Sequence, residues 1–247
     1  MITELRSTEK AEPLFREWND TMIRSCLQQV MGKIYVNDTE QPKSACAILG
    51  CFAFYTGEPN EEFVRNKPKG FLIMTPQNED WAKLIEHCHP TAKRVIRYAM
   101  KHDTDFDRGQ LQDLINNLPD EYELRSIDGY LYDQCLKDPL TADFVANFGC
   151  KENYLKLGLG FVILKNGVIV SGASSFSRYR EGIEIEVDTA ESERKKGLAS
   201  ISCAALILKC LEMGLYPSWD AQNLTSVRLA EKLSYQIDYE YSAYEIE

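Results

Sequence analysis

The stretch LASISCAALILKCLEMG, at 198–214, constrains the fold of this chain more than any other. Apolar residues lie on nearly every side of a helix drawn through it. Such a helix has no face suited to water and needs to be buried against a sheet. Gly214 is typical of the position just after a helix. The chain must therefore supply strands that pack beside this helix.

Strands are indeed predicted on both sides of it. In LGFVILKNGVIVSGASSFS, at 159–177, Asn166-Gly167 separates two apolar runs, which is a strong signal for a β-hairpin. REGIEIEVDT, at 180–189, follows with strict alternation. Its two faces carry Ile183, Ile185 and Val187 on one side, and Glu184, Glu186 and Asp188 on the other. After the helix we predict a strand at 215–221, a helix at 223–234 and a last strand at 235–246.

The first half is predicted to be a smaller α/β unit. Helices are expected over 13–31, 75–87, 92–102 and 107–118, and strands over 33–37, 45–57 and 70–76. The composition changes at NNLPDEYEL, where Asn, Pro and Asp interrupt the pattern. We therefore predict an N-terminal α/β domain at 1–118 and a second domain at 119–247. The fold class is α/β (α+β).

The charge disfavours some partners. The 247 residues carry a net charge of −10, which disfavours general nucleic-acid and anionic-membrane binding, because both depend on a basic face, and we expect neither partner. No apolar run is long enough to span a membrane, and the first residues, MITELRSTEK, contain no apolar signal core. The cysteines form no CxxC pair, and HCHP at 87–90 has no second cluster to complete a metal site. We expect a soluble, cytoplasmic protein without a metal ion.

The loop ESERKKGLAS, at 191–200, is the most informative one. Arg194, Lys195 and Lys196 stand together in an acidic chain and precede Gly197, where the buried helix begins. The first amides of a helix have no internal partner and favour an anion, and glycine lets a phosphate approach the backbone closely. Cations at this end oppose the helix dipole unless an anion is bound. The same residues also suit a solvated loop, so both interpretations stay open at this point.

The order of these features resembles the C-terminal core of the GNAT superfamily of acyl-CoA-dependent N-acyltransferases. RKKGLA at 194–199 fits the family motif Q/R-x-x-G-x-G/A, and Asn223 followed by a helix ending in EKLSY fits a later one. The resemblance covers about 121–247, and the whole chain looks like a bacterial subgroup with an extra N-terminal domain. It implies a GNAT fold, in which helices flank a mixed, mostly antiparallel central sheet, preceded by the smaller α/β domain.

The resemblance implies how acetyl-CoA, the expected co-substrate, would be bound. In this family the loop amides hold the pyrophosphate of coenzyme A. The matching loop positions are Arg194, Lys195, Lys196, Gly197, Leu198 and Ala199. The backbone of Val187 and Thr189 would pair with the pantetheine arm, and the strand at 215–221 would splay away to leave room. Asn223 would either touch the pantetheine or cap the following helix, because Asn is also an ordinary N-cap.

The resemblance also implies direct attack of an amine on a thioester. The amine must be neutral, which requires a general base. Glu184 and Glu186 lie on the strand beside the expected thioester and are the candidate bases, although alternating glutamates are equally normal on a half-exposed strand. Family members often carry a tyrosine acid at the position that Ala230 occupies here. Tyr235, water or a residue of the N-terminal half would have to replace that tyrosine.

We therefore predict an enzyme, an acetyl-CoA-dependent N-acetyltransferase that acts on a small-molecule or peptide amine. The N-terminal domain is expected to cover the acceptor side, because ligand sites favour domain interfaces. The alternative, which the alanine at 230 favours, is a non-catalytic regulatory protein that binds acyl-CoA. The sequence names neither the acceptor nor the acyl chain. It leaves the oligomeric state open, and a dimer is compatible with it.

Overall fold

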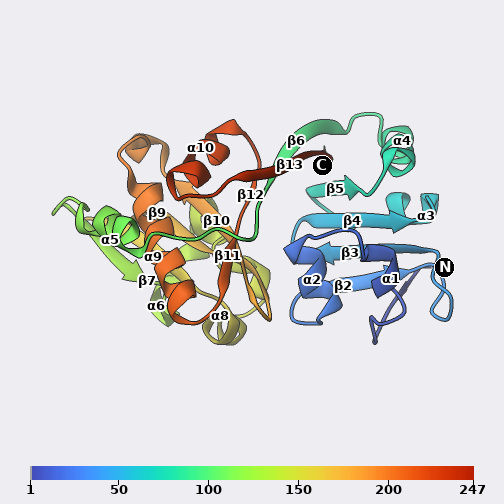
Figure 1. The fold of residues 1–247 in the computed structure, drawn as a ribbon, viewed down its shortest axis with the longest axis horizontal. Coiled ribbons are helices and arrows are strands. Elements are labelled where there is room, and N and C mark those ends of the chain that lie inside the picture. Colours follow the sequence, from blue (N-terminus) through green and yellow to red (C-terminus); the bar gives the residue numbers. More distant parts are fainter. Residues whose placement is uncertain (1) are drawn as a thin grey trace. The chain divides into compact units, whose positions relative to one another are not determined.

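A computed structural model describes residues 2–247. The chain divides into two compact units, which Figure 1 shows in the colours of the sequence. Unit 1 holds the chain up to Arg97 together with Glu240–Glu247, and unit 2 holds Tyr98–Tyr239. The chain passes from one unit to the other inside two strands, β6 (Lys93–Met100) and β13 (Ile237–Ile246).

Unit 1 is built on a sheet whose strands follow the order β1-β2-β3-β4-β5-β13. Its pairs are antiparallel except for β4 and β5, which run parallel. The strands that precede β6 are β1 (Thr3–Glu4), β2 (Lys33–Val36), β3 (Ser44–Leu49), β4 (Phe52–Gly57) and β5 (Leu72–Pro76). The helices are α1 (Glu12–Phe15), α2 (Thr21–Leu27), α3 (Glu61–Arg65) and α4 (Glu79–Cys88).

Helix α4 shows how local sequence and packing cooperate in unit 1. The Asn78 side chain accepts hydrogen bonds from the amides of Asp80 and Trp81, a cap that stabilises a helix by about 1 kcal/mol. Trp81 is fully buried, and its ring centroid lies 5.3 Å from that of Tyr55 on β4. The cap begins the helix, and the aromatic contact fixes it on the sheet.

Unit 2 is built on a five-stranded sheet of order β11-β10-β9-β8-β7, in which β10 and β11 are the parallel pair. Its strands are β7 (Tyr122–Ser126), β8 (Gly160–Lys165), β9 (Val168–Tyr179), β10 (Gly182–Thr189) and β11 (Tyr216–Ser218), with β12 (Asp220–Ala221) paired to β6. Its helices are α5 (Arg108–Asn116), α6 (Gly129–Cys135), α7 (Pro139–Ala142), α8 (Lys151–Leu157), α9 (Leu198–Glu212) and α10 (Leu224–Lys232). Two 3₁₀ turns complete it, η1 (Ala146–Phe148) and η2 (Glu191–Glu193).

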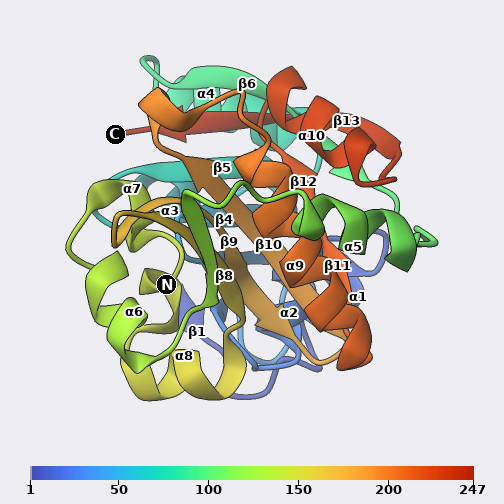
Figure 2. The same ribbon diagram turned by 90° about the vertical axis from the view of Figure 1, so that its left-hand side faces the viewer.

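Helix α9 lies at the centre of the unit 2 core, as its sequence requires. Its residues with no exposed surface include Cys203, Ala204, Leu206, Ile207 and Cys210. The helix packs on β8, β9 and β10, and α5 lies beside it in Figure 2. The two cysteines are therefore core residues, and burial raises the pKa of the Cys210 thiol to about 12.

The predicted hairpin between β8 and β9 is present. Asn166 and Gly167 have φ angles of 52° and 79°. These left-handed values belong to a type I′ turn, which matches the twist of the two strands it joins. The turn sets the register of β8 against β9, and β10 in turn pairs with β9 from Gly182 to Thr189.

The helix predicted over 92–102 is wrong, because this segment forms β6. Lys93 makes a 2.8 Å ion pair with Glu245 of β13, and Arg94 donates a 2.9 Å hydrogen bond to the Ser242 hydroxyl. Pairing with a distant strand decides the structure of this segment, and the local pattern does not reveal it.

Two further elements are divided where one was predicted. The helix expected over 13–31 is two short helices, because Asp20 caps a new start at α2 through the amides of Met22 and Ile23. The strand expected over 45–57 is the hairpin of β3 and β4, which turns at Gly50 with a φ of 55°.

The predicted domain boundary, between 118 and 119, does not coincide with the division into compact units. Helix α5 precedes that boundary, yet its Leu111 belongs to the core cluster around α9. The last strand returns to unit 1, where Tyr244 pairs with Met74 of β5. Contacts between segments far apart in the sequence therefore divide the chain after Arg97 and again after Tyr239.

Gly182, where β9, β10 and β11 meet, generates a stability prediction. A Cβ atom there would lie 2.2 Å from the Tyr216 carbonyl oxygen and 2.4 Å from the Tyr179 hydroxyl. We expect Gly182→Ala to lower the free energy of unfolding by about 1–3 kcal/mol, the usual cost of overpacking, as measured by urea denaturation. Gly129→Ala is the control, because its Cβ would meet side chains at 3.6 Å or more. Equal losses in both variants would contradict this steric explanation.

Candidate functional site

The sheet of unit 2 opens on one side of β10. Strand β11 pairs with β10 only where Gly182–Glu184 lies opposite Tyr216–Ser218. The chain then continues through Trp219 into β12, which pairs with β6 instead. Among the described strands, Ile185–Thr189 therefore pairs with β9 alone. The strands part as the family resemblance implied.

The loop that follows β10 contains two left-handed residues, Lys195 with a φ of 64° and Gly197 with a φ of 86°. Gly197 directly precedes α9, and no side chain caps that helix. A Cβ atom on Gly197 would meet no atom within 4 Å. The first amides of α9, which begin at Leu198, thus have no side-chain cap and, with the helix dipole, favour an anion.

The structure separates the three cations of this loop. The Arg194 side chain turns back to β10, where its Nε donates to the Thr189 carbonyl at 3.1 Å. The Lys196 ammonium donates to the Glu193 carboxylate at 2.7 Å. Lys195 is exposed, and within residues 2–247 its ammonium makes no ion pair. The sequence suggested three mobile charges at this point, whereas the structure holds two of them in place.

A carboxylate that sequence reasoning missed anchors the loop. Glu193, on η2, is 8% exposed. Its carboxylate accepts hydrogen bonds from the Lys196 ammonium at 2.7 Å, the Tyr122 hydroxyl at 2.5 Å and the Lys165 ammonium at 3.3 Å. These donors lower the pKa of Glu193 from 4.5 to about 2. Tyr122 lies 71 positions away in the sequence, so no local signal could have revealed this contact.

The two candidate bases have different surroundings. Glu184 is 6% exposed and lies at the end of the pairing with β11, opposite Ser218 on one side and Ser177 on the other. Glu186 is only half-buried and pairs with Ser174 of β9. Glu184 is therefore the carboxylate at the point where the strands part.

The side chains of Val187 and Thr189 make contacts within unit 2. Val187 is half-buried and packs against the core cluster around α9. Thr189 is buried, and its hydroxyl lies 2.7 Å from that of Ser171 on β9. At Val187 the backbone, rather than the side chain, remains for a ligand. The Thr189 amide donates to the Asp188 carboxylate at 2.6 Å, and the Thr189 carbonyl accepts from the Arg194 guanidinium at 3.1 Å, so both backbone groups of Thr189 already have partners.

Residues of the second family motif have structural roles. The Asn223 side chain caps α10, because it accepts hydrogen bonds from the amides of Thr225 and Ser226 at 2.9 and 3.0 Å. Ala230 is fully buried in the core. The Tyr235 hydroxyl donates to the Pro217 carbonyl at 2.6 Å, and burial raises its pKa well above 10. Tyr235 is therefore already engaged in packing.

Other candidate features lie elsewhere. The described residues contain no group of His, Cys, Asp and Glu side chains that could hold a metal ion. In the HCHP segment, the His89 ring forms a 3.1 Å hydrogen bond with the Val64 carbonyl. None of the helices within residues 2–247 has the length and apolar character needed to cross a membrane.

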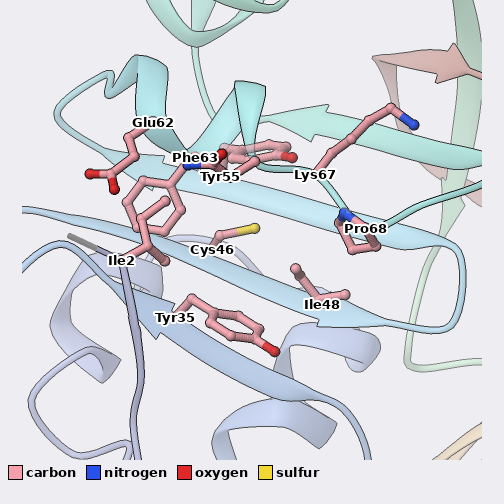
Figure 3. Close-up of a pocket in the computed structure, with 10 residues that line it drawn as sticks. Ile2, Tyr35, Cys46, Ile48, Tyr55, Glu62, Phe63, Lys67 and Pro68 are labelled. Atoms are coloured by element: carbon pink, nitrogen blue, oxygen red, sulfur yellow. The ribbon is translucent and has the colours of Figure 1, made fainter.

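Unit 1 contains a cleft of about 360 Å³ beside strands β2, β3 and β4 (Figure 3). Tyr35, Cys46 and Tyr55 line it as one row across these strands, in register. The Lys67 ammonium points away from the other labelled side chains and donates to the Gly70 carbonyl at 3.0 Å. None of the site residues predicted from the sequence lines this cleft.

A model of the GNAT acetyltransferase family matches residues 12–244. The chain belongs to this family. As a GNAT protein it is an enzyme of the N-acetyltransferase class, and the predicted family and fold class are confirmed. The match spans both units rather than the C-terminal part alone.

Individual relatives agree with this assignment. A GCN5-related N-acetyltransferase-like protein from Streptococcus suis is 45% identical, with a TM-score of 0.93 over 97% of this chain and 98% of that one. The uncharacterized N-acetyltransferase YdfB of Bacillus subtilis is 35% identical over 95 residues, which are 38% of this chain and only 36% of that relative. A tandem GNAT protein from the clavulanic acid biosynthesis pathway shares the fold, with a TM-score of 0.59 and 11% identity over 100% of this chain and 98% of that one.

Glu193 links the stability of this GNAT protein to acid pH. A carboxyl group whose pKa is lowered on folding stabilises the folded state fully above its unfolded pKa, and this contribution is lost as the pH falls through the folded pKa. For Glu193 that range runs from 4.5 down to about 2. We expect the thermal midpoint to drop over this range, and Glu193→Gln to flatten the drop, in differential scanning fluorimetry. Glu191→Gln, on the same turn but exposed, is the control. An unchanged slope in Glu193→Gln would contradict the assignment.

Proposed function

We propose that this GNAT protein transfers an acetyl group from acetyl-CoA to the amine of a small molecule or a peptide. One observation carries the proposal. The unpaired edge of β10 starts at Ile185, directly after Glu184, and leads through the loop to the N-terminus of α9, which no side chain caps. Acetyl-CoA joins a thioester to a pyrophosphate through a long amide-containing arm, so it needs a reactive site, a strand edge and an anion site in that order.

The residues of the loop fit the pyrophosphate end. The left-handed backbone of Gly197 and the open space around its α-carbon form a cradle that a larger side chain would fill. The exposed Lys195 adds a cation beside this cradle. Lys196 would contribute its backbone amide, because Glu193 holds its side chain. Arg194 would fix the entry of the loop, because its amide donates to the Glu191 carbonyl at 3.3 Å and its side chain donates to the Thr189 carbonyl. The amides from Lys195 to Ala199 would then surround the pyrophosphate.

The edge of β10 suits the pantetheine arm. Val187 would present backbone groups to the amides of that arm, because its side chain is packed inside unit 2. Thr189 would do so by exchanging the contacts that its amide and its carbonyl make with Asp188 and Arg194. Asn223 caps α10 through its side-chain oxygen, and a pantetheine contact would use the nitrogen of the same amide. These three residues would orient the arm, and no charge on the protein is required along it.

Glu184 is the base we favour over Glu186. When bound, acetyl-CoA supplies an acyl carbon open to a nucleophile. Glu184 lies where the strands part, and its carboxylate would take the proton of the attacking amine, directly or through one water. The backbone amide of Val187 would donate to the carbonyl oxygen as negative charge develops on it. Glu186 would have no catalytic role, and its carboxylate would be hydrated on the half-exposed face of the strand.

No protein acid is assigned to the leaving thiolate. Ala230 occupies the position of the usual tyrosine, and the Tyr235 hydroxyl is already bonded to the Pro217 carbonyl. A thiol of this kind has a pKa of about 8.5, so the thiolate can leave and take a proton from water. The alternative of a non-catalytic acyl-CoA sensor rested on Ala230, and membership of an acetyltransferase family does not favour it.

Three other expectations remain proposals. Unit 1 would help to select the acceptor, which deletion of side chains in its cleft would test. A cytoplasmic location rests on the cysteine pattern, and cell fractionation would test it. The oligomeric state, which the sequence leaves open and for which a dimer is compatible, would follow from analytical ultracentrifugation.

The anion site predicts a specific effect of Gly197→Ala. Gly197 and Gly214 flank the two ends of α9, both have positive φ angles, and a Cβ atom on either would meet nothing within 4 Å. Both substitutions strain the backbone alike, but only the first places a methyl group at the open amides. We expect Gly197→Ala to weaken acetyl-CoA binding by about tenfold or more in calorimetry, an effect of about 1.4 kcal/mol. Equal affinities in the two variants would rule out this loop as the pyrophosphate site.

The base assignment predicts different effects at the two glutamates. With a panel of amines and detection of free coenzyme A, we expect Glu184→Gln to reduce turnover by about 10²–10⁴-fold, the usual contribution of a general base. Glu186→Gln, two positions along the same strand, should reduce it by far less. Acetyl-CoA affinity should stay unchanged in both variants. The reverse order of effects would assign the base to Glu186.

A further inference from the structure

A polar cluster, in which Tyr122 and Glu193 are buried and the other side chains reach the surface, adjoins the anion-binding loop. We call it the Glu193 cluster, and its members are Glu121, Tyr122, Lys165, Glu193 and Lys196. Glu193 and Lys196 belong to the segment between β10 and α9, Tyr122 lies on β7 and Lys165 on β8. The cluster therefore ties this segment to two strands on the far side of the sheet from β11.

The contacts converge on one carboxylate. Both oxygens of Glu193 are used: Oε2 accepts from the Tyr122 hydroxyl and the Lys196 ammonium, and Oε1 accepts from the Lys165 ammonium. The Lys165 ammonium also lies 5.0 Å from the centre of the Tyr122 ring and 3.3 Å from a carboxylate oxygen of Glu121. Hydrogen bonds to a charged group are stronger than neutral ones, so this arrangement is stiff.

The Glu193 cluster adjoins a strained position of the backbone, Lys195. Lys195 is not a glycine, yet it has a φ of 64°, a conformation that persists only where the surroundings impose it. The residue before it, Arg194, is bonded to the Thr189 carbonyl, and the residue after it, Lys196, is bonded to Glu193. Lys195 is thus held from both sides, immediately before the open amides of α9.

We propose that Glu193 is a positioning residue for the anion-binding loop. It fixes the left-handed turn at Lys195 and takes up the charge of Lys196, so that the Lys195 ammonium and the amides of α9 face the pyrophosphate in one arrangement. This inference rests on the proposed function, because it names what holds the loop that would bind acetyl-CoA. Glu193 itself touches no ligand.

The direction in which pyrophosphate affinity changes when the Glu193 charge is removed distinguishes a positioning role from a purely electrostatic one. Glu193 is an anion close to a site proposed for an anion. If only its charge mattered, removing that charge would strengthen pyrophosphate binding, because Lys196 would be released to contribute. If Glu193 positions the loop, the same change weakens binding. If Glu193 merely stabilises the fold, the thermal midpoint falls and the affinity stays constant.

The experiment measures binding to the full-length protein. Acetyl-CoA affinity is determined by calorimetry, and inorganic pyrophosphate is used as a competitor. The variants are Glu193→Gln, which removes the charge at constant size, and Tyr122→Phe, which removes one donor and leaves the charge. Glu191→Gln, an exposed glutamate on the same turn, is the control. Thermal midpoints at neutral pH report stability in parallel.

We expect both Glu193→Gln and Tyr122→Phe to weaken acetyl-CoA and pyrophosphate by the same factor, about five- to tenfold, because small misplacements of binding groups are costly. The control should bind as the wild type does. Unchanged or tighter binding in Glu193→Gln would overturn the proposal, and Tyr122→Phe decides in the same way if Glu193→Gln fails to fold. A wild type that binds neither ligand would overturn the proposed function itself, and this inference with it.

Discussion

Burial of α9 is the constraint on which the rest of unit 2 depends. The helix has no polar face, so the sheet of β8, β9 and β10 and the neighbouring α5 must enclose it. Each large apolar side chain buried in this way contributes roughly 1.5–3 kcal/mol. The enclosure also fixes where the helix begins. Leu198 is buried while Gly197 is exposed, so the first amides emerge at the end of β10, where the strand has lost its partner β11.

The sequence predicted those features whose determinants lie close together in the chain. The Asn166-Gly167 turn, the strand β10 and the apolar helix α9 each need only neighbouring residues, and all three are present. Burial along β10 does not alternate as predicted, because Glu184 is buried together with Ile183 and Ile185. The strand β6 and the role of Glu193 could not be predicted in this way. The pairing of β6 depends on β13, and the surroundings of Glu193 depend on Tyr122, which lies 71 positions away. Contacts between distant segments determine both, and no residue pattern near either one reveals them.

The same limit applies to the loop cations. Three adjacent basic residues show that positive charge is present, but not which of the three side chains has an acidic partner. In the structure, two acidic groups of the same segment pair with two of the three cations. Asp188 lies 3.8 Å from the Arg194 guanidinium, and Glu193 lies 2.7 Å from the Lys196 ammonium. The net positive charge beside α9 is therefore smaller than the sequence suggests, and the backbone amides become correspondingly more important.

The free-energy costs of the two proton transfers explain why a missing acid at Ala230 would matter less to catalysis than a missing base at Glu184. An alkylamine resembles lysine, whose pKa is about 10.4, so deprotonating it at pH 7 requires about 4–5 kcal/mol. A thiol with a pKa of about 8.5 lies within about 2 kcal/mol of ionisation at the same pH, so the departing thiolate needs little help. An acetyltransferase can therefore dispense with a tyrosine acid more readily than with a base. If Glu184, the buried carboxylate where β10 and β11 part, is the base as proposed, it would supply the larger of the two requirements, and the enzyme could work with Ala230 in its core.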